Sequence, residues 1–278
     1  MKISIRPLPK ECKLSIQSIH DFKEKKQRRE KISMITCYDS WSARLIAQSE
    51  VDCVLVGDSL AMVMHGHSST LPADPGLMAL HTAAVVRGAP KAFVVGDLPF
   101  LSYRKSLADS VAAVEALMKA GAQAVKLEGA YGNETLIEHL HHSGVPVMGH
   151  IGLTPQSVHS LGGFKVQGRE DSQARKLLEQ AKTLEQSGCF ALVLECIPME
   201  LAKTITQELS IPTIGIGAGP DTDGQVLVLQ DMLGMNSGFQ PKFLRQYLKG
   251  QELIVQALNQ YHKDVTNQNF PSPEESYQ

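Results

Sequence analysis

The sequence of 278 residues predicts a single-domain α/β protein folded as a (β/α)8 TIM barrel. Short apolar runs alternate with longer amphipathic stretches, which is typical of parallel strands joined by crossover helices. About eight such units in roughly 250 residues match this barrel better than an open doubly wound sheet. No GxGxxG motif follows the first run, which argues against a dinucleotide-binding Rossmann fold.

The predicted strands are the short apolar runs. They start near Ile32, Cys53, Ala92, Ala124, Val145, Ala191, Pro212 and Val226. Between them, apolar residues recur every three or four positions, which predicts helices over residues 41–49, 77–87, 107–119, 134–142, 172–186 and 200–209. Glycines that suit a left-handed helix cap follow four of these stretches, at Gly88, Gly121, Gly144 and Gly188.

The barrel is predicted to occupy residues 31–262, with a polar segment on each side. Residues 1–30 form a polar lead-in, and we interpret its basic run, residues 23–31, as the solvated face of a helix rather than a docking patch. Residues 263–278 form a polar tail. This tail has two prolines and few apolar residues, so we expect it to be disordered.

Charge and cysteine content restrict the class of function. With 27 basic and 29 acidic residues the net charge is -2, so no overall field favours nucleic acid or an anionic membrane, and small molecules are the expected partners. The five cysteines lack a CxxC spacing and fall mostly in apolar runs, which indicates reduced thiols and a cytoplasmic location. We expect neither a signal peptide nor a membrane span, because no apolar stretch approaches about 18 residues.

Four acidic residues and one lysine stand at the carboxyl ends of apolar runs. Lys126 and Glu128 lie two positions apart, so in a strand they point to the same face. Asp58, Asp97 and Glu195 end three other runs. In a barrel the carboxyl ends of the strands meet at one rim, which is where active sites lie. Carboxylates gathered there repel one another unless a cation neutralises them, and oxygen ligands favour Mg²⁺ over zinc.

Four features of the sequence each allow two interpretations. His65 and His67 are interpreted as ordinary loop residues, with metal ligation as the alternative. His150 ends the fifth run and either faces the rim or is a hydrogen-bonded core histidine. The glycine-rich segment 160–168 is either a mobile lid over the rim or an ordinary loop. The segment 215–219, GIGAG, is either a tight turn or an anion cradle.

A series of motifs runs in order from about residue 31 to residue 247. It includes VGDS at 56–59, GHSSTLP at 66–72, HTAAVVRGAP at 81–90, GDLPF at 96–100, VKLEG at 125–129, GHIGLTPQS at 149–157, LVLECIP at 192–198 and TDGQVLVLQDMLG at 222–234. This series resembles the ketopantoate hydroxymethyltransferase (3-methyl-2-oxobutanoate hydroxymethyltransferase) family of pantothenate biosynthesis. Chance is a poor explanation for so many motifs in one order.

The resemblance implies a metal, a substrate and the residues that bind them. The two Asp of VGDS and GDLPF and the Glu of KLEG map to Asp58, Asp97 and Glu128 as ligands of Mg²⁺. In the family the metal chelates 3-methyl-2-oxobutanoate through its carboxylate and keto oxygens. The substrate-binding residues implied here are Asp58, Ser59, Asp97 and Lys126.

The resemblance also implies the chemistry. Glu195 is the base that removes the C3 proton, and His150 lines the site without an assigned step. The co-substrate 5,10-methylenetetrahydrofolate donates the one-carbon unit, the product is 2-dehydropantoate, and the assembly is a homodecamer. A C–H next to a ketone is a weak acid, so the charge that develops on the keto oxygen must be stabilised, and Mg²⁺ and Lys126 can both do this.

Two other functions are kept as alternatives. One is a related Mg²⁺-dependent barrel enzyme that forms or cleaves a carbon-carbon bond in another 2-oxo acid without folate. The other is a non-catalytic barrel that binds the ligand without proton exchange. The chain departs from the family pattern in the loop 61–74, which bears on loop closure, substrate size and metal choice but contains none of the implied ligands; the atypical residues are Ala61, His65, Ser68 and Asp74.

Overall fold

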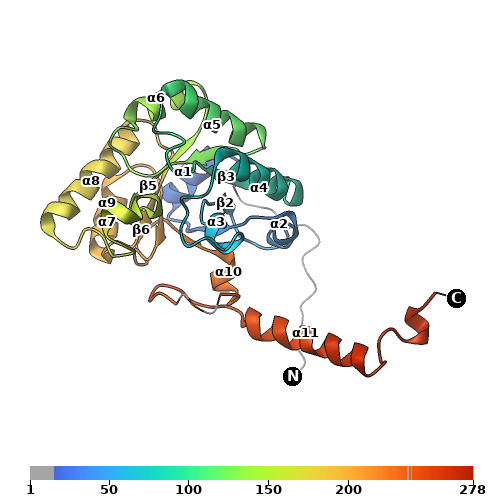
Figure 1. The fold of residues 1–278 in the computed structure, drawn as a ribbon. Coiled ribbons are helices and arrows are strands. Elements are labelled where there is room, and N and C mark those ends of the chain that lie inside the picture. Colours follow the sequence, from blue (N-terminus) through green and yellow to red (C-terminus); the bar gives the residue numbers. More distant parts are fainter. Residues whose placement is uncertain (1–15, 237, 239, 278) are drawn as a thin grey trace. The chain divides into compact units, whose positions relative to one another are not determined.

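The computed structural model describes residues 16–236, 238 and 240–277 (Figure 1). The chain falls into two compact units, Met1–Leu227 and Val228–Gln278, and the first contains the barrel. The first half of the predicted lead-in, residues 1–15, lies outside the described residues. The domain boundaries drawn from the sequence stay predictions.

Eight parallel strands close into a barrel in the described part of the first unit, which confirms the predicted fold class. Neighbours pair in chain order, and β8 pairs with β1. The strand residues are almost all buried, because their two faces pack against the barrel interior and the surrounding helices. The strands are β1 (Ile32–Thr36), β2 (Cys53–Val56), β3 (Phe93–Asp97), β4 (Ala124–Lys126), β5 (Val147–Gly152), β6 (Ala191–Glu195), β7 (Thr213–Ile216) and β8 (Gly224–Leu227).

Helices connect the strands and surround them (Figure 1). The six helices predicted from periodicity are all present, with ends within three residues of the prediction. Asp39, Asp74 and Ser106 cap three of them by accepting backbone N–H groups of the first turn. The helices of this unit that follow β1 are α2 (Ser40–Ile46), α3 (Leu60–Val63), α4 (Pro75–Gly88), α5 (Leu107–Lys119), α6 (Glu134–His142), α7 (Val158–Leu161), α8 (Asp171–Gln186) and α9 (Met199–Glu208).

Helix α1 (Ile19–Arg28) precedes the barrel and closes its amino-terminal end. Phe22 is fully buried, and its ring centroid lies 5.3 Å from that of Phe93 and 5.1 Å from that of Phe190. Phe93 begins β3, and Phe190 directly precedes β6. The lead-in therefore contributes a hydrophobic plug to the core, which its polar composition did not predict.

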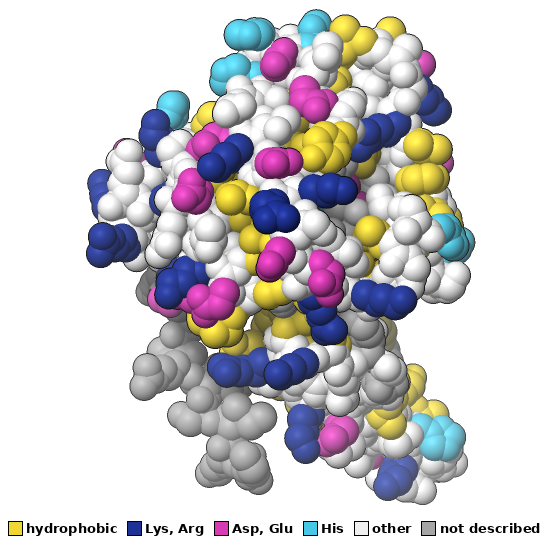
Figure 2. Space-filling view, turned by 90° about the vertical axis from the view of Figure 1, so that its left-hand side faces the viewer, with side chains coloured by type: hydrophobic (Ala, Val, Ile, Leu, Met, Phe, Trp, Pro, Cys, Tyr) yellow, Lys and Arg dark blue, Asp and Glu magenta, His cyan; other side chains and the backbone are white. Residues whose placement is uncertain are grey.

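The basic run of the lead-in is partly paired. Lys25 Nζ lies 3.0 Å from Asp52 Oδ1, and Lys26 Nζ lies 2.8 Å from Asp223 Oδ2. Both acids stand directly before a strand, so these pairs hold α1 against the amino-terminal end of the barrel. The helix is confirmed, whereas these two lysines are paired rather than solvated. Elsewhere, charged side chains of both signs are interspersed on the face shown in Figure 2.

We expect the substitution Phe22→Ala to lower the free energy of unfolding by about 3–5 kcal/mol, because it removes a fully buried aromatic ring and leaves a cavity. Urea unfolding followed by circular dichroism measures the change. The matched control is Lys23→Ala on the exposed side of the same helix, with an expected change within about 0.5 kcal/mol. Equal stabilities of the two variants would mean that α1 does not plug the barrel.

The second unit contains α10 (Leu229–Met232) and α11 (Gly250–Thr266). Nearly all of α11 is exposed, including apolar residues whose spacing places them along one side of the helix: Ile254, Leu258, Tyr261 and Val265. A short 3-10 turn, Pro273–Glu275, lies within the tail that the sequence predicted to be disordered. No helix in the described part of the chain is long and apolar enough to cross a membrane.

Candidate active site

The predicted site residues come from five neighbouring strands and meet at the carboxyl-terminal rim of the barrel. Asp97, Lys126 and Glu195 are the last residues of β3, β4 and β6. Asp58 and Glu128 follow β2 and β4 by two residues, and His150 lies within β5. The carboxyl ends coincide because all the strands are parallel, and Asp97 is directly paired in register with Lys126. The placement that the sequence predicted for these residues is thus found.

An ion pair forms the centre of the cluster. Lys126 Nζ lies 2.7 Å from Asp97 Oδ1 and 3.8 Å from Glu128 Oε1. The backbone N–H of Asp58 donates to Asp97 Oδ2 at 3.2 Å. Residues Asp58, Asp97, Lys126 and Glu128 are each at most 4% exposed. One lysine therefore faces three carboxylates in a site with little water.

The pKa values of the clustered side chains are shifted by burial and by the neighbouring negative charges. Burial raises the pKa of Asp58, and the charges of Asp97 and Glu128 raise it further. Burial also raises the pKa of Asp97, although Lys126 opposes this. Burial would lower the pKa of Lys126, but the surrounding carboxylates outweigh it and raise that pKa above its usual value. Lys126 is therefore charged and partly offsets the negative charge of the carboxylates around it.

His150 connects the cluster to Glu195. Its Nδ1 lies 3.4 Å from Glu128 Oε1, and its Nε2 lies 3.3 Å from Glu195 Oε2. Nε2 is not aligned for a hydrogen bond with any described residue, so the contact with Glu195 is electrostatic rather than a formed bond. Burial and Lys126 would lower the pKa of His150, but the two glutamates outweigh them and raise it to about 9. The imidazole is thus protonated at neutral pH, and His150 faces the rim.

The donor set of the cluster has the chemistry of a magnesium site, although its present arrangement is not that of bound ligands. In the described residues, no three His, Cys, Asp or Glu side chains converge closely enough to hold a metal ion. Asp58, Asp97 and Glu128 instead accept hydrogen bonds from protein donors. Their oxygens are nevertheless the ligands that Mg²⁺ prefers, and they come from three acids buried at one rim. The residues fit the ion.

Ser59 sits at the edge of this cluster beside Tyr38. The two hydroxyl oxygens are 2.8 Å apart. The backbone carbonyl of Tyr38 accepts a hydrogen bond from His81 Nδ1, and His81 Nε2 lies 2.9 Å from His65 Nε2. The atypical residue His65 is therefore connected through two residues to the proposed substrate contact Ser59. Whether either histidine of the pair His65 and His67 ligates a metal stays untested.

Gln156 and Tyr103 also belong to the cluster, and the sequence reasoning missed both. Gln156 Nε2 donates to Asp58 Oδ2 at 2.9 Å, and its backbone N–H donates to Glu128 Oε2 at 3.1 Å. The Tyr103 hydroxyl donates to Gln156 Oε1 at 2.7 Å. Gln156 lies in the motif GHIGLTPQS, so the motif was the signal for it. Tyr103 lies in a loop with no such signal.

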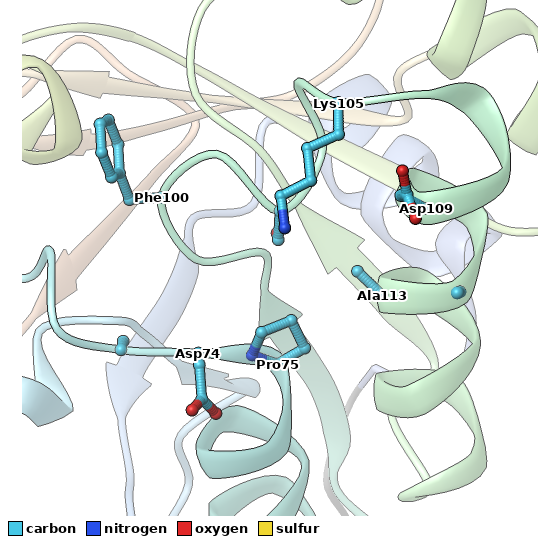
Figure 3. A pocket seen from close by; sticks show the side chains of 9 residues that line it. Asp74, Pro75, Phe100, Lys105, Asp109 and Ala113 are labelled. Carbon is cyan, nitrogen blue, oxygen red and sulfur yellow. The ribbon is translucent and has the colours of Figure 1, made fainter.

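A separate cavity of about 370 Å³ lies between the amino-terminal ends of α4 and α5 (Figure 3). Pro75 lines it on one side, next to Asp74, whose carboxylate is turned toward α4, and Lys105, Asp109 and Ala113 line it on the other. None of the predicted site residues lines this cavity. The candidate active site is therefore the charged cluster at the rim and not this cavity.

Comparisons with known proteins address the family directly. The model of the ketopantoate hydroxymethyltransferase family matches residues 17–273. A 3-methyl-2-oxobutanoate hydroxymethyltransferase of Bdellovibrio bacteriovorus is 63% identical over 262 residues, which cover 94% of this chain and all of that protein. One from Coxiella burnetii is 61% identical over 252 residues, 90% of this chain and 95% of that protein.

Solved structures with low sequence identity share the fold alone. A phosphonopyruvate hydrolase in complex with oxalate and Mg²⁺ has a TM-score of 0.61 at 9% identity and covers 94% of this chain and 93% of its own. A 2,3-dimethylmalate lyase of the PEP mutase/isocitrate lyase superfamily has a TM-score of 0.60 at 13% identity, covering 95% of this chain and 92% of its own. The family model and the two relatives carry the assignment: this chain belongs to the ketopantoate hydroxymethyltransferase family of enzymes.

Proposed function

We propose that the protein transfers a hydroxymethyl group from 5,10-methylenetetrahydrofolate to 3-methyl-2-oxobutanoate and forms 2-dehydropantoate. The observation that supports this best is the rim cluster, in which a buried lysine contacts Asp97 and Glu128, and His150 connects Glu128 to Glu195. The relatives at 61% and 63% identity bear the name of this activity.

Asp58, Asp97 and Glu128 would hold Mg²⁺ in this proposal. When bound, the ion polarises the keto oxygen of the substrate and supplies the positive charge that the carboxylates need. Lys126 binds the anionic substrate and stabilises the negative charge that develops on its keto oxygen. Ser59, whose hydroxyl is oriented by Tyr38, donates a hydrogen bond to the same substrate.

Glu195 is suited to remove the C3 proton. Its side chain is 18% exposed, whereas those of Asp97 and Glu128 are 2% exposed, so it lies at the open side of the cluster. One oxygen of Glu195 lies 3.3 Å from His150 Nε2, so the imidazole orients the carboxylate. Glu195 therefore lies where a base on the substrate side is needed.

The reaction is tested with purified protein, Mg²⁺, 3-methyl-2-oxobutanoate and 5,10-methylenetetrahydrofolate, and 2-dehydropantoate is followed by mass spectrometry. We expect product only when all components are present. Cleavage of a 2-oxo acid without folate would instead identify a carbon-carbon lyase. Substrate binding without any turnover would identify a non-catalytic barrel.

We also propose that the protein acts in the cytoplasm as a homo-oligomer, a homodecamer by its resemblance to the family. The exposed apolar residues of α11 support self-association, because a stripe of this kind on a soluble protein is typical of an interface. Leu258, with 61% of its surface exposed, lies in the middle of this stripe.

The substitution Leu258→Glu is therefore expected to shift the protein toward smaller assemblies, since it places a charge within an apolar contact. Sedimentation velocity at several protein concentrations measures the shift. The matched control is Asn259→Glu, the exposed neighbour on another side of the helix. An unchanged distribution for Leu258→Glu would exclude α11 from the interface.

A further inference from the structure

Gln156 makes every hydrogen bond that its side chain needs inside the protein. It is 5% exposed and lies in the 3-10 turn Pro155–Ser157 that follows β5. Its Nε2 donates to Asp58 Oδ2 and to the backbone carbonyl of Leu98, both at 2.9 Å. Its Oε1 accepts from the hydroxyl of Tyr103 at 2.7 Å. A buried amide with all its partners fixes the groups around it.

The groups around Gln156 determine which way its amide points. A flipped amide would place Oε1 beside Asp58 Oδ2 and the Leu98 carbonyl, and oxygen would then face oxygen. On the other side, the Tyr103 hydroxyl donates to Oε1 at 2.7 Å and also contacts the Glu128 carbonyl at 3.4 Å. Tyr103 therefore holds the oxygen end of an amide whose nitrogen end binds Asp58.

The two ends of Gln156 reach two different carboxylates. The side chain binds Asp58, which follows β2, and the backbone N–H binds Glu128 Oε2 at 3.1 Å, which follows β4. Strand β3 separates these two acids in the barrel, and both are buried. Without a common anchor, repulsion would drive their side chains apart.

We propose that Gln156 and Tyr103 are a positioning pair that anchors one carboxylate oxygen of Asp58 and one of Glu128 and so orients both acids toward a shared divalent cation. This inference rests on the proposed metal role of these two acids. Neither Gln156 nor Tyr103 is required to touch substrate. The proposed effect of Tyr103 on the metal runs through Gln156, so removing its hydroxyl costs metal affinity by releasing the amide.

Mn²⁺ binding to the full-length protein, followed by the electron paramagnetic resonance signal of the free ion, tests the proposal without any assay of activity. Gln156→Leu removes both side-chain donors and keeps the backbone N–H, and we expect it to weaken Mn²⁺ binding about ten- to a hundredfold, as losses of outer-shell partners do. Tyr103→Phe keeps the ring and is expected to weaken binding by a smaller factor.

The double variant separates a shared role from two independent defects. If Tyr103 acts through the amide, Gln156→Leu with Tyr103→Phe binds Mn²⁺ no more weakly than Gln156→Leu alone. If the losses of Mn²⁺ affinity in the two single variants multiplied in the double variant, the two residues would act independently and the proposed pair would be overturned. The matched control is Gln123→Leu, which removes two side-chain hydrogen bonds at the amino-terminal end of β3, whereas Gln156→Leu removes three at the rim, and this control should leave Mn²⁺ affinity unchanged. Equal losses in Gln123→Leu and Gln156→Leu would reduce the effect to general destabilisation and overturn the proposal.

Asp58→Asn distinguishes this inference from the function on which it rests. If the wild type binds Mn²⁺, Asp58→Asn weakens binding and Gln156→Leu does not, the positioning pair is overturned and the metal site stands. If the wild type does not bind Mn²⁺, or Asp58→Asn binds it as tightly as the wild type, the proposed metal site itself fails and the positioning pair fails with it.

Discussion

The Glu195→Gln variant is expected to form product about 10²- to 10⁴-fold more slowly than the wild type, because an amide cannot accept the C3 proton that the proposed base removes. Glutamine preserves the size of the side chain. Glu195 contacts His150 and lies on the open side of the cluster, away from the ion pair of Lys126 and Asp97. Mn²⁺ affinity should therefore stay close to that of the wild type, because Glu195 is not among the proposed ligands.

The rate and the metal affinity must be measured on the same preparation. Steady-state product formation gives the first and Mn²⁺ titration gives the second. Glu200→Gln removes an exposed carboxylate near the start of α9 and is the matched control, with both quantities unchanged. A slow Glu195→Gln variant that had also lost Mn²⁺ would place Glu195 among the ligands and overturn the division of roles.

The second large effect is expected from Lys126→Met, which keeps much of the side-chain length and removes the charge. Lys126 Nζ is 2.7 Å from Asp97 and 3.8 Å from Glu128, in a site where few waters can replace it. Loss of one buried stabilising donor typically lowers kcat by about 10²- to 10³-fold, and we expect a loss of that size here. The KM for 3-methyl-2-oxobutanoate should rise as well, because the anion loses its cationic partner.

Lys119→Met, at the exposed end of α5, is the control for the loss of a lysine. Circular dichroism establishes that both variants are folded. If Lys126→Met retained the kinetic constants of the wild type, the lysine would serve only to neutralise the carboxylates in the free protein and would have no part in the reaction.

Much of the site follows from the sequence because strand geometry is local. Side chains alternate along a strand, which predicted that Lys126 and Glu128 share a face. Strand β4 ends at Lys126, so alternation alone does not place Glu128, yet both side chains are buried at the rim. Acids that end parallel strands had to meet at one rim once the alternation of strand and helix indicated a barrel, which placed Asp58, Asp97 and Glu195 without any structure. Which functional role each of them plays came from the resemblance to the family and not from this geometry.

Other parts depend on contacts that no local pattern encodes. The burial of Phe22 could not be predicted from composition, because α1 is polar overall and only one of its faces packs against the barrel. Tyr103 and Gln156 lie together beside Glu128 although they are 53 residues apart in the chain. The contact between His150 and Glu195 depends on the pairing of β5 with β6, where Gly152 lies opposite Glu195. A side chain at Gly152 would approach the backbone carbonyl of Glu195 to 2.2 Å, so this close strand pairing needs glycine.

The most direct test of the account is the exchange of the C3 proton of 3-methyl-2-oxobutanoate in D₂O, followed by NMR with protein and Mg²⁺ and without folate. This isolates proton removal from one-carbon transfer. We predict that the C3 signal disappears with the wild type, persists when EDTA replaces Mg²⁺, and persists with Glu195→Gln. If the wild type binds the substrate and yet no exchange occurs even after folate is added, or if Glu195→Gln exchanges as fast as the wild type, the assignment of base, metal and substrate is contradicted.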